Sequence, residues 1–356
     1  MKGYESTIEK DQSYKKLIIT AVIIIVAAVV IALVIKAVST EHIGTLPEIK
    51  SEAEPTDTLP VETEAPEEPP KASGYANRTE NTVALGTTID CKNAILIDLE
   101  SNTVVAEKGG DEKIYPASMT KVMTALVAIE HCDNLDATFT VTNEIIAPLA
   151  AANASVAGFT PGEQVTVRDL LYGTILPSGA DGTGALAVFV SGSEEEFAKL
   201  MNEKCEELGL TGTHFSDASG LHKDDHYSTC HDIALIMKAA LENETLREIL
   251  GTDEYTTSKT PEHPDGIPLQ STMYSRVDGK EEFDDKIEII GGKTGYTEEA
   301  GNCLVSAARV AGEEKTWIFV CAGGESKWKP IYDTIHAYRT FLGIKYDGEY
   351  VPKYMR

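Results

Sequence analysis

Three short motifs along the chain carry side chains that could act together on one substrate. Ser118-Met119-Thr120-Lys121 holds a hydroxyl and an amine three residues apart, and Ser178-Gly179-Ala180 adds a second hydroxyl. Lys293-Thr294-Gly295 adds a cation beside a third hydroxyl. A serine deprotonated by an amine suits acyl transfer through a covalent serine ester, and a cation suits binding of a carboxylate. The sequence therefore predicts a serine acyl-transfer site, provided that the three motifs converge in space.

The S-x-x-K spacing alone is weak, because it also occurs at residues 13–16 and 326–329. Ser118 differs in its context, since Pro116 predicts a helix that begins just before it. Ser118 and Lys121 then share one face, and the helix N-terminus offers N–H groups to a developing oxyanion. An N-cap serine followed by a solvated lysine is an equally good local reading.

The other two motifs have plain alternatives as well. Lys293 follows an apolar run at 287–290 and two glycines, which favours close approach of a ligand over a simple edge-strand lysine. Burial beside Lys293 would lower the pKa of Lys121 and let it act as a base. Ser178 lies between two expected helices, where a turn capped by Asp181 explains it locally just as well.

The elements that must position these motifs indicate an α+β fold. Apolar runs at 94–98 and 103–106 predict a β-hairpin, and runs at 287–290, 302–310 and 315–321 predict later strands. Between them, helical spacing predicts helices after Pro116, from Asp181, after a capping box at Ser193 and Glu196, and after His231; a last helix is expected at 331–342. We expect one antiparallel sheet with strands from both ends of the chain, flanked by helices and carrying a helical subdomain.

The N-terminal part predicts a membrane anchor. Residues 17–35 are nineteen positions without a charge, which as a helix would reach about 28 Å, close to the thickness of a bilayer core. Lys15 and Lys16 precede the run, so we expect a cytoplasmic tail at 1–16 and a single transmembrane helix at 17–38. A cleaved signal peptide is the alternative, although its apolar region would be shorter.

Beyond the anchor, composition predicts a disordered linker at 39–75, rich in Pro, Glu and Thr, and a folded domain at 76–356. The net charge of −26 disfavours nucleic acid as a partner. None of the six cysteines forms a C-x-x-C pair, so we expect no metal site from them and interpret most as small buried side chains rather than disulfides.

Order and spacing of the motifs give the chain a family resemblance. Over residues 76–343 it resembles the serine D-alanyl-D-alanine carboxypeptidases, the low-molecular-mass penicillin-binding proteins. The resemblance rests on the motif set and on the segments at 115–121, 158–163, 226–229 and 291–297.

The resemblance implies a transpeptidase/β-lactamase-like fold and a role for each motif. It implies Ser118 as the acylated nucleophile, Lys121 as its general base and Ser178 as a proton relay. Substrate-binding residues would be Lys293, Thr294, Gly295 and Tyr296, with the N–H groups of Ser118 and Tyr296 as the oxyanion hole. No metal or organic cofactor is expected.

The implied substrate is the peptidoglycan stem pentapeptide, whose terminal D-alanine would be removed, and β-lactams would inhibit. The implied location is the bacterial cell membrane, with the catalytic domain outside and a single N-terminal helix as anchor. How hydrolysis compares with transpeptidation is left open by the sequence.

Two features depart from the family pattern. The middle motif is usually Ser-x-Asn, whereas position 180 is alanine, so we expect slower or altered turnover, with Asp181 as a partial replacement. Many relatives also carry a β-rich domain and a C-terminal amphipathic helix, whereas this chain ends at Arg356 soon after the last expected helix, so we expect anchorage at the N-terminus.

Three alternatives remain at this point. A β-lactamase or esterase could use the same three motifs. A metal peptidase could use His222 and His226, although the H-E-x-x-H pattern is absent. A sensor or wall-binding module could retain the fold without activity, with Ala180 as the sign of decay.

Overall fold

The computed structural model describes residues 74–277, 283 and 285–344. The expected cytoplasmic tail at 1–16, the transmembrane helix at 17–38 and nearly all of the linker at 39–75 lie outside these residues. Within the described part, every helix is too short or too polar to cross a bilayer.

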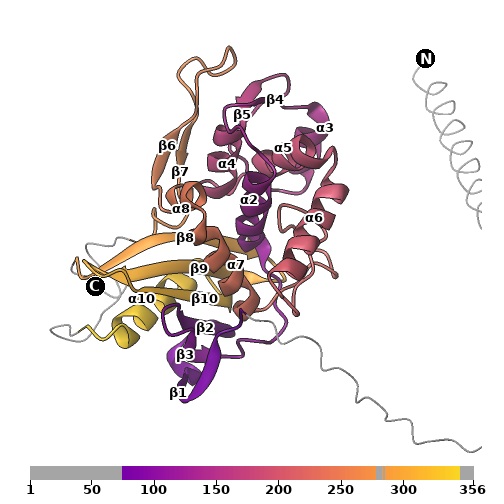
Figure 1. Ribbon diagram of the computed structural model, residues 1–356. Helices are drawn as coiled ribbons and strands as arrows, with labels where there is room; N and C mark the ends of the chain where they lie inside the picture. Colours follow the sequence, from indigo (N-terminus) through magenta and orange to yellow (C-terminus); the bar gives the residue numbers. More distant parts are fainter. Residues whose placement is uncertain (1–73, 278–282, 284, 345–356) are drawn as a thin grey trace, which may run out of the picture. The chain divides into compact units, whose positions relative to one another are not determined.

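A six-stranded sheet forms the centre of the folded domain, in the order β1-β3-β2-β10-β9-β8 (Figure 1). Its strands are β1 (Asn77–Ala84), β2 (Asn93–Asp98), β3 (Thr103–Lys108), β8 (Ile287–Thr297), β9 (Gly301–Val310) and β10 (Thr316–Gly324). As expected, strands from both ends of the domain meet in one sheet, since β10 pairs with β2.

The expectation of a purely antiparallel sheet is wrong at one edge. Strand β1 pairs with β3 in parallel, so the sheet is mixed, whereas the other four pairs are antiparallel. The sequence did not indicate β1 because its side chains are mostly polar and exposed, without the alternating apolar pattern of a half-buried strand. An edge strand needs little apolar surface, because only one of its sides pairs.

Helices cover both faces of the sheet (Figure 1). One face carries α7 (Cys230–Glu242) and the helical subdomain, and the other carries α10 (Lys329–Phe341). The subdomain contains α2 (Thr120–Glu130), α3 (Asn143–Ala151), α4 (Val167–Ile175), α5 (Ala180–Ser191), α6 (Glu194–Glu207) and α8 (Glu244–Leu250). Two small antiparallel pairs complete it, β4 (Thr138–Thr140) with β5 (Gln164–Thr166) and β6 (Glu254–Thr256) with β7 (Pro268–Gln270).

Strand β2 shows how the sheet separates two hydrophobic clusters. Ile95 and Ile97 join the cluster on the side of α2 and α7, whereas Ala94 and Leu96 join the cluster under α10. This follows from the two-residue period of a strand, which sends alternate side chains to opposite faces. A sheet buried on both faces makes a rigid base for the elements above it.

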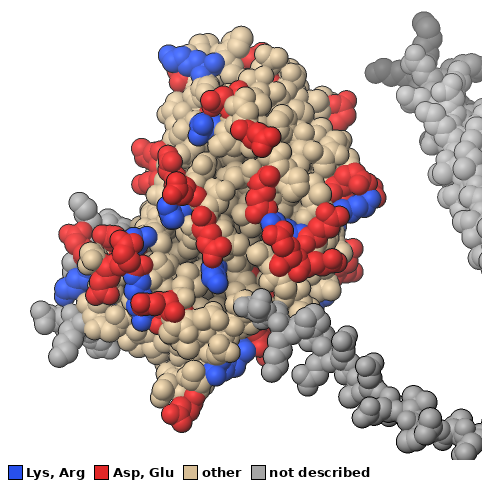
Figure 2. Space-filling model, in the orientation of Figure 1, with Lys and Arg blue, Asp and Glu red and all other residues tan. Residues whose placement is uncertain are grey.

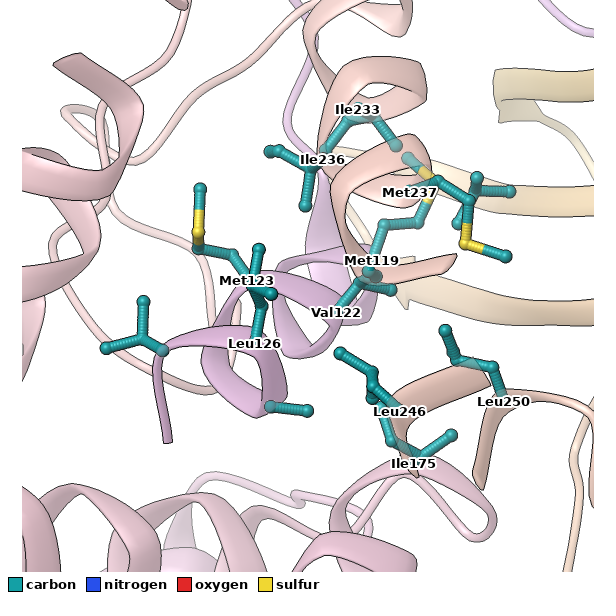
Figure 3. Packing of buried hydrophobic residues seen from close by; sticks show 14 of the residues in the cluster. Met119, Val122, Met123, Leu126, Ile175, Ile233, Ile236, Met237, Leu246 and Leu250 are labelled. Carbon is teal, nitrogen blue, oxygen red and sulfur yellow. The ribbon is translucent and has the colours of Figure 1, made fainter. Parts of the chain in front are cut away.

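The core around α2 fixes the first motif. Met119, Val122, Met123 and Leu126 recur at helical spacing and are almost completely buried. Figure 3 shows these side chains facing hydrophobic residues of neighbouring helices, namely Ile175 of α4, Ile233, Ile236 and Met237 of α7, and Leu246 and Leu250 of α8. The helix that follows Ser118 is therefore held from several sides.

Most elements expected from the sequence are present. The 94–106 hairpin, the helix after Pro116 and the late strands all form, and the Ser193 hydroxyl caps α6 by accepting from the N–H of Glu196. One expected strand was too short, because the strand that begins at Ile287 continues as β8 to Thr297. The third motif therefore lies on a strand paired along its length with β9.

Candidate active site

The structure brings Ser118 and Lys121 into direct contact. Ser118 lies in a 3-10 turn, Ala117–Met119, immediately before α2, and Lys121 is in the first turn of that helix. The Nζ of Lys121 donates to the Oγ of Ser118 over 2.8 Å and to the carbonyl of Ser219 over 2.7 Å. The ammonium side chain is buried, so its position is set by these contacts rather than by solvent.

Burial changes the protonation of this amine. Removal from water disfavours the charged form and lowers the pKa of Lys121 to about 8, against smaller opposing effects of the Asp217 and Asp181 carboxylates. An amine with a pKa near 8 is neutral in part at ordinary pH and can take a proton from a serine hydroxyl. Lys121 therefore has both the position and the pKa that a general base for Ser118 requires.

Strand β8 packs directly against the nucleophile turn at Gly295. A Cβ at this position would lie 3.0 Å from the Ser118 nitrogen and 3.1 Å from the carbonyl oxygen of Pro116. Only glycine permits this approach without a shift of the backbone. The approach brings the third motif beside the first, and Thr294, Gly295 and Tyr296 all border the same cavity as Ser118.

Lys293 is buried in strand β8, two residues before Gly295. It is 1 % exposed, its Nζ donates to the carbonyl of Thr294 over 3.0 Å, and it is not among the residues that line the cavity. Burial holds its pKa well below the usual range, and the positive charges of Lys121 and Arg276 add to the effect. Lys293 lies on the same face of β8 as Gly295, because their partners Val305 and Cys303 both belong to the cluster on the side of α2. Thr294 lines the cavity, where its hydroxyl bonds that of Thr272 over 2.7 Å.

The middle motif lines the cavity as well. Ser178 is buried and has a φ of 66°, a left-handed conformation that non-glycine residues adopt at a cost. Ala180 follows at the start of α5, and its N–H donates to the carbonyl of Ser155 over 2.8 Å. The loop that contains Ser155 is therefore fastened to the motif, and both border the cavity.

The expectation that Asp181 replaces the missing amide is wrong. Its carboxylate is buried and accepts the backbone N–H groups of Ala157, Gly158 and Phe159 at 2.8, 2.8 and 3.1 Å. Asp181 also does not line the cavity. Its charge holds the neighbouring loop in place and cannot also offer a substrate the donor and acceptor of an amide.

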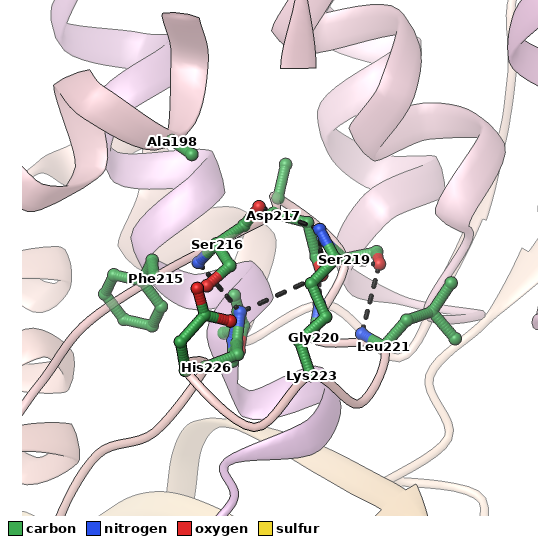
Figure 4. A network of polar contacts seen from close by, with 12 residues as sticks. Ala198, Phe215, Ser216, Asp217, Ser219, Gly220, Leu221, Lys223 and His226 are labelled. Atoms are coloured by element: carbon green, nitrogen blue, oxygen red, sulfur yellow. Dashed lines mark hydrogen bonds and ion pairs between the residues drawn. The ribbon is translucent and has the colours of Figure 1, made fainter. Parts of the chain in front are cut away.

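A loop between α6 and α7 supplies the second partner of Lys121 (Figure 4). The Oδ1 of Asp217 accepts from the N–H and Oγ of Ser219 and from the N–H of Gly220, at 2.8 to 2.9 Å. The Oδ2 lies 3.4 Å from Lys223 Nζ and 3.8 Å from His226 Nδ1. This network fixes the turn whose Ser219 carbonyl faces Lys121. The sequence analysis missed Asp217, since nothing in its spacing links it to position 121.

All three motifs meet at one cavity of about 350 Å³. Its walls come from the α2 turn, the 153–155 loop, the start of α5, the 219–221 turn and β8. Sequence reasoning also missed three polar residues in this wall, Asn153, Thr272 and Arg276. They lie in irregular segments without a motif, so only the fold brings them together.

The cavity contrasts in charge with the surface around it. Figure 2 shows acidic side chains spread over the visible face, as expected for a net charge of −26. Among the described residues, the charged groups that line the cavity are all basic, namely Lys121, Arg276 and Lys327. A cavity lined by cations within an acidic protein favours a small anionic ligand.

The described residues do not support a histidine metal site. His226 is buried and its ring bonds Thr120 and the N–H of Ser216, while His222 packs edge-on against Tyr115. One other group has suitable spacing for a metal, Cys91, Cys321 and Asp333. Its carboxylate already accepts two backbone N–H groups, and the pKa values of both thiols are raised. All six cysteines are free, and five are buried, as expected.

Comparison with known proteins places the fold and the motifs in one family. Residues 77–323 match the family described as D-alanyl-D-alanine carboxypeptidase. The carboxypeptidase DacF of Bacillus subtilis is 35% identical over 226 residues, 62% of this chain and 54% of DacF. The DD-transpeptidase of Streptomyces K15 superimposes with a TM-score of 0.65 at 30% identity, covering 72% of this chain and 98% of that structure.

A third relative, the carboxypeptidase of Mycobacterium tuberculosis H37Rv, superimposes with a TM-score of 0.59 at 27% identity. The chain spans about half the length of some of the curated relatives it matches, DacF among them. The family match nevertheless covers more than half of this chain and contains all three motifs. The chain belongs to the D-alanyl-D-alanine carboxypeptidase family.

Proposed function

We propose that the protein is a penicillin-sensitive serine D,D-carboxypeptidase that removes the terminal D-alanine from peptidoglycan stem pentapeptides. The observation that carries the proposal is the 2.8 Å contact between the Nζ of Lys121 and the Oγ of Ser118, within a cavity bordered by the other two motifs. Family membership supports the same activity.

In the first half-reaction, Lys121 takes the proton of Ser118 while Oγ attacks the carbonyl carbon of the penultimate D-alanine. The tetrahedral oxyanion is stabilised by the N–H groups of Ser118 and Tyr296. Ser178 relays the proton from Lys121 to the departing amine, the peptide bond breaks, and free D-alanine leaves an acyl ester on Ser118. This assignment is supported by the position of Ser178 in the wall of the cavity.

In the second half-reaction, water takes the place of the departed amine. Lys121 removes a proton from the water, which attacks the ester, and Oγ of Ser118 recovers its proton as the shortened peptide leaves. Thr294, Gly295 and Tyr296 bind the substrate along the edge of β8, and Lys293, on the face of the strand turned toward the nucleophile turn, is the cation for its carboxylate. Gly295 allows β8 to pack this closely against the nucleophile turn.

The experiment that tests the proposal uses a fluorescent penicillin and a peptide that ends in D-Ala-D-Ala. We expect covalent labelling and release of D-alanine by the wild type, and neither by Ser118→Ala. Labelling without release would favour a transpeptidase or a sensor over a carboxypeptidase. Rapid turnover of the penicillin itself would favour a β-lactamase, and absence of both signals would overturn the proposal.

We further propose that residues 17–38 anchor the protein in the bacterial membrane, with 39–75 as a spacer and the catalytic domain outside the cell. The support is the uncharged run at 17–35 and the lysines before it. Fractionation of the full chain should find it in membranes, and protease added to spheroplasts should remove the catalytic domain. Release of a shortened protein into the medium would instead indicate a cleaved signal peptide.

A further inference from the structure

Strand β8 fixes the direction in which a peptide substrate lies in the cavity. It is the last strand of the described sheet, so its outer edge can pair with an extended peptide. In the proposed reaction the terminal carboxylate lies at Lys293, and the scissile carbonyl points to the N–H of Tyr296, further along the same strand. The rest of the peptide must therefore run past Thr297 toward the turn that follows β8.

The turn after β8 carries a carboxylate on this path. Thr297, the last residue of β8, lines the cavity, and Glu299 follows in the turn. The side chain of Glu299 is 43% exposed, and among the described residues neither a lysine nor an arginine pairs with it. An extended chain advances about 3.3 Å per residue, so the residue before the penultimate D-alanine comes beside Thr297 and the turn. Glu299 is thus within reach of the side chain of that residue.

The neighbouring turn shows on which side of β8 the Glu299 side chain lies. Its Oε2 is 4.0 Å from the Nδ1 of His222, which follows Leu221 of the cavity wall. That nitrogen is buried and forms no hydrogen bond within the described part of the chain, while the ring packs edge-on against Tyr115. The carboxylate therefore lies beside the cavity, where the end of β8 meets the 219–222 turn.

The charge at this end of the cavity differs from the charge of its lining. The charged lining residues of the described part are Lys121, Arg276 and Lys327, all basic, which suits the carboxylate end of the substrate. Glu299 instead offers two acceptor oxygens, and hydrogen bonds from an ammonium to a carboxylate are among the strongest. A peptide with an anion at its end and a cation before its two D-alanines matches this order of charges.

We infer that Glu299 binds a free amine on the residue before the two D-alanines, and that the enzyme thereby prefers stem peptides whose side-chain amine has not been cross-linked. Cross-linking acylates such an amine and removes its positive charge, so a cross-linked stem peptide loses the contact. The inference rests on the proposed function, because it names the substrate of that reaction more closely. Glu299 acts on binding alone, so its effect belongs in KM rather than in kcat.

The test compares two probes in the full-length protein, an Nα-acetyl-lysyl peptide ending in D-Ala-D-Ala and the same peptide with its side-chain amine acetylated. The wild type should hydrolyse the free-amine probe with a kcat/KM about fivefold higher, mainly through KM, as expected for a partly exposed ion pair. In Glu299→Gln this preference should fall below about twofold, through loss with the free-amine probe. Added salt should reduce the preference of the wild type in the same way.

Glu288→Gln is the matched control, because it removes the same charge from an exposed position of the same strand, outside the cavity wall. Glu298→Gln tests the assignment within the turn. Both variants should keep the preference of the wild type, and turnover of the acetylated probe shows that Glu299→Gln is folded. A preference that persists in Glu299→Gln, or one that is lost in either of the other variants, would overturn the inference.

The outcome is separable from that of the proposed function. A wild type that releases D-alanine from neither probe and is not labelled by penicillin contradicts both. A wild type that hydrolyses the two probes with the same kcat/KM contradicts only the role of Glu299. Titration of inactive Ser118→Ala with both probes adds an equilibrium measurement that needs no change in the turn, and the free-amine probe should bind about fivefold tighter. Equal affinities would overturn the inference as well.

Discussion

The Nζ of Lys121 lies 2.8 Å from the Oγ of Ser118, and the same amine donates to the carbonyl of Ser219 over 2.7 Å. Two acceptors on one buried amine fix its direction before any substrate arrives. Preorganisation of this kind removes the entropy cost of finding the reactive geometry during the reaction. The contact joins a 3-10 turn to the first turn of α2, so the fold itself holds the pair.

The first prediction concerns the amine. Lys121→Met keeps the length and apolar stem of the side chain but removes the base, so the rate of Ser118 acylation should fall about 1,000-fold, within the usual range for loss of general-base catalysis. Stopped-flow labelling with fluorescent penicillin measures this rate. Lys199→Met, which changes an exposed lysine of α6, is the control and should react as the wild type does. Acylation of Lys121→Met at the wild-type rate would contradict the role of Lys121.

The second prediction concerns pH. Lys121 can accept a proton only when its amine is neutral. Because the pKa of Lys121 is about 8, the neutral fraction increases as the pH rises toward 8. The second-order rate of acylation should therefore rise between pH 6 and 8 and level off above the pKa. At pH 7 roughly one tenth of the enzyme would hold a neutral amine.

The same profile tests the neighbouring carboxylate. Asp217 raises the pKa of Lys121, so Asp217→Asn should move the midpoint of the profile to lower pH, by about one unit. The Asn side chain can still accept from Ser219 and Gly220, which preserves the turn. The pKa of His226, which also faces Asp217, is lowered to about 4, so this ring does not titrate in the measured range. A midpoint that stays in place would show that Asp217 acts on position alone.

The third prediction concerns the middle motif. Ala180→Asn would supply an amide at the cavity wall, and Asp181 cannot provide one because its carboxylate is bound to the 157–159 loop. Acylation by a D-Ala-D-Ala peptide should become about tenfold faster, as expected for one added hydrogen bond in a desolvated site. Ala180→Leu, with a side chain of similar size and no amide, is the matched control and should be no faster than the wild type. An unchanged rate in Ala180→Asn would mean that the missing amide does not limit this enzyme.

How far the sequence predicted the molecule differs between its parts. The two ends of the site, Ser118 with Lys121 and the strand that carries Lys293, were found because their patterns are local: a helix start with i,i+3 residues, and an apolar run before glycines. The apolar runs that form β2, β9 and β10 were found for the same reason. These features depend on neighbours in the sequence, which periodicity reports directly.

The parts that the sequence did not predict depend on distant contacts. Strand β1 is polar and exposed, so no pattern indicated its parallel pairing with β3. Asp217 and Arg276 lie in turns and reach the site only because the fold closes around it. Strand β8 also has a bulge between Ile289 and Gly291, just before the third motif, which no pattern in the sequence indicated.

The fourth prediction concerns Gly295. Gly295→Ala places a Cβ 3.0 Å from the Ser118 nitrogen, so β8 and the nucleophile turn must move apart. The expected result is acylation at least 100-fold slower, because the oxyanion donors no longer converge, with a loss of only about 1–2 kcal/mol in the free energy of unfolding. Urea melts and penicillin labelling measure the two quantities on the same sample. Gly74→Ala, where the nearest atom is 3.8 Å away, should leave both unchanged.

The fifth prediction concerns metal. The serine, the amine and the hydroxyl relay account for every proton in the proposed reaction, so EDTA should leave the release of D-alanine unchanged, whereas penicillin should abolish it. His226 is held by Thr120 and Ser216, and its pKa is lowered, so His226→Gln should act through the shape of the 216–226 loop. Its activity should fall to the same extent with and without added zinc. Inhibition by EDTA that zinc reverses, together with resistance to penicillin, would show instead that a metal peptidase mechanism operates at this cavity.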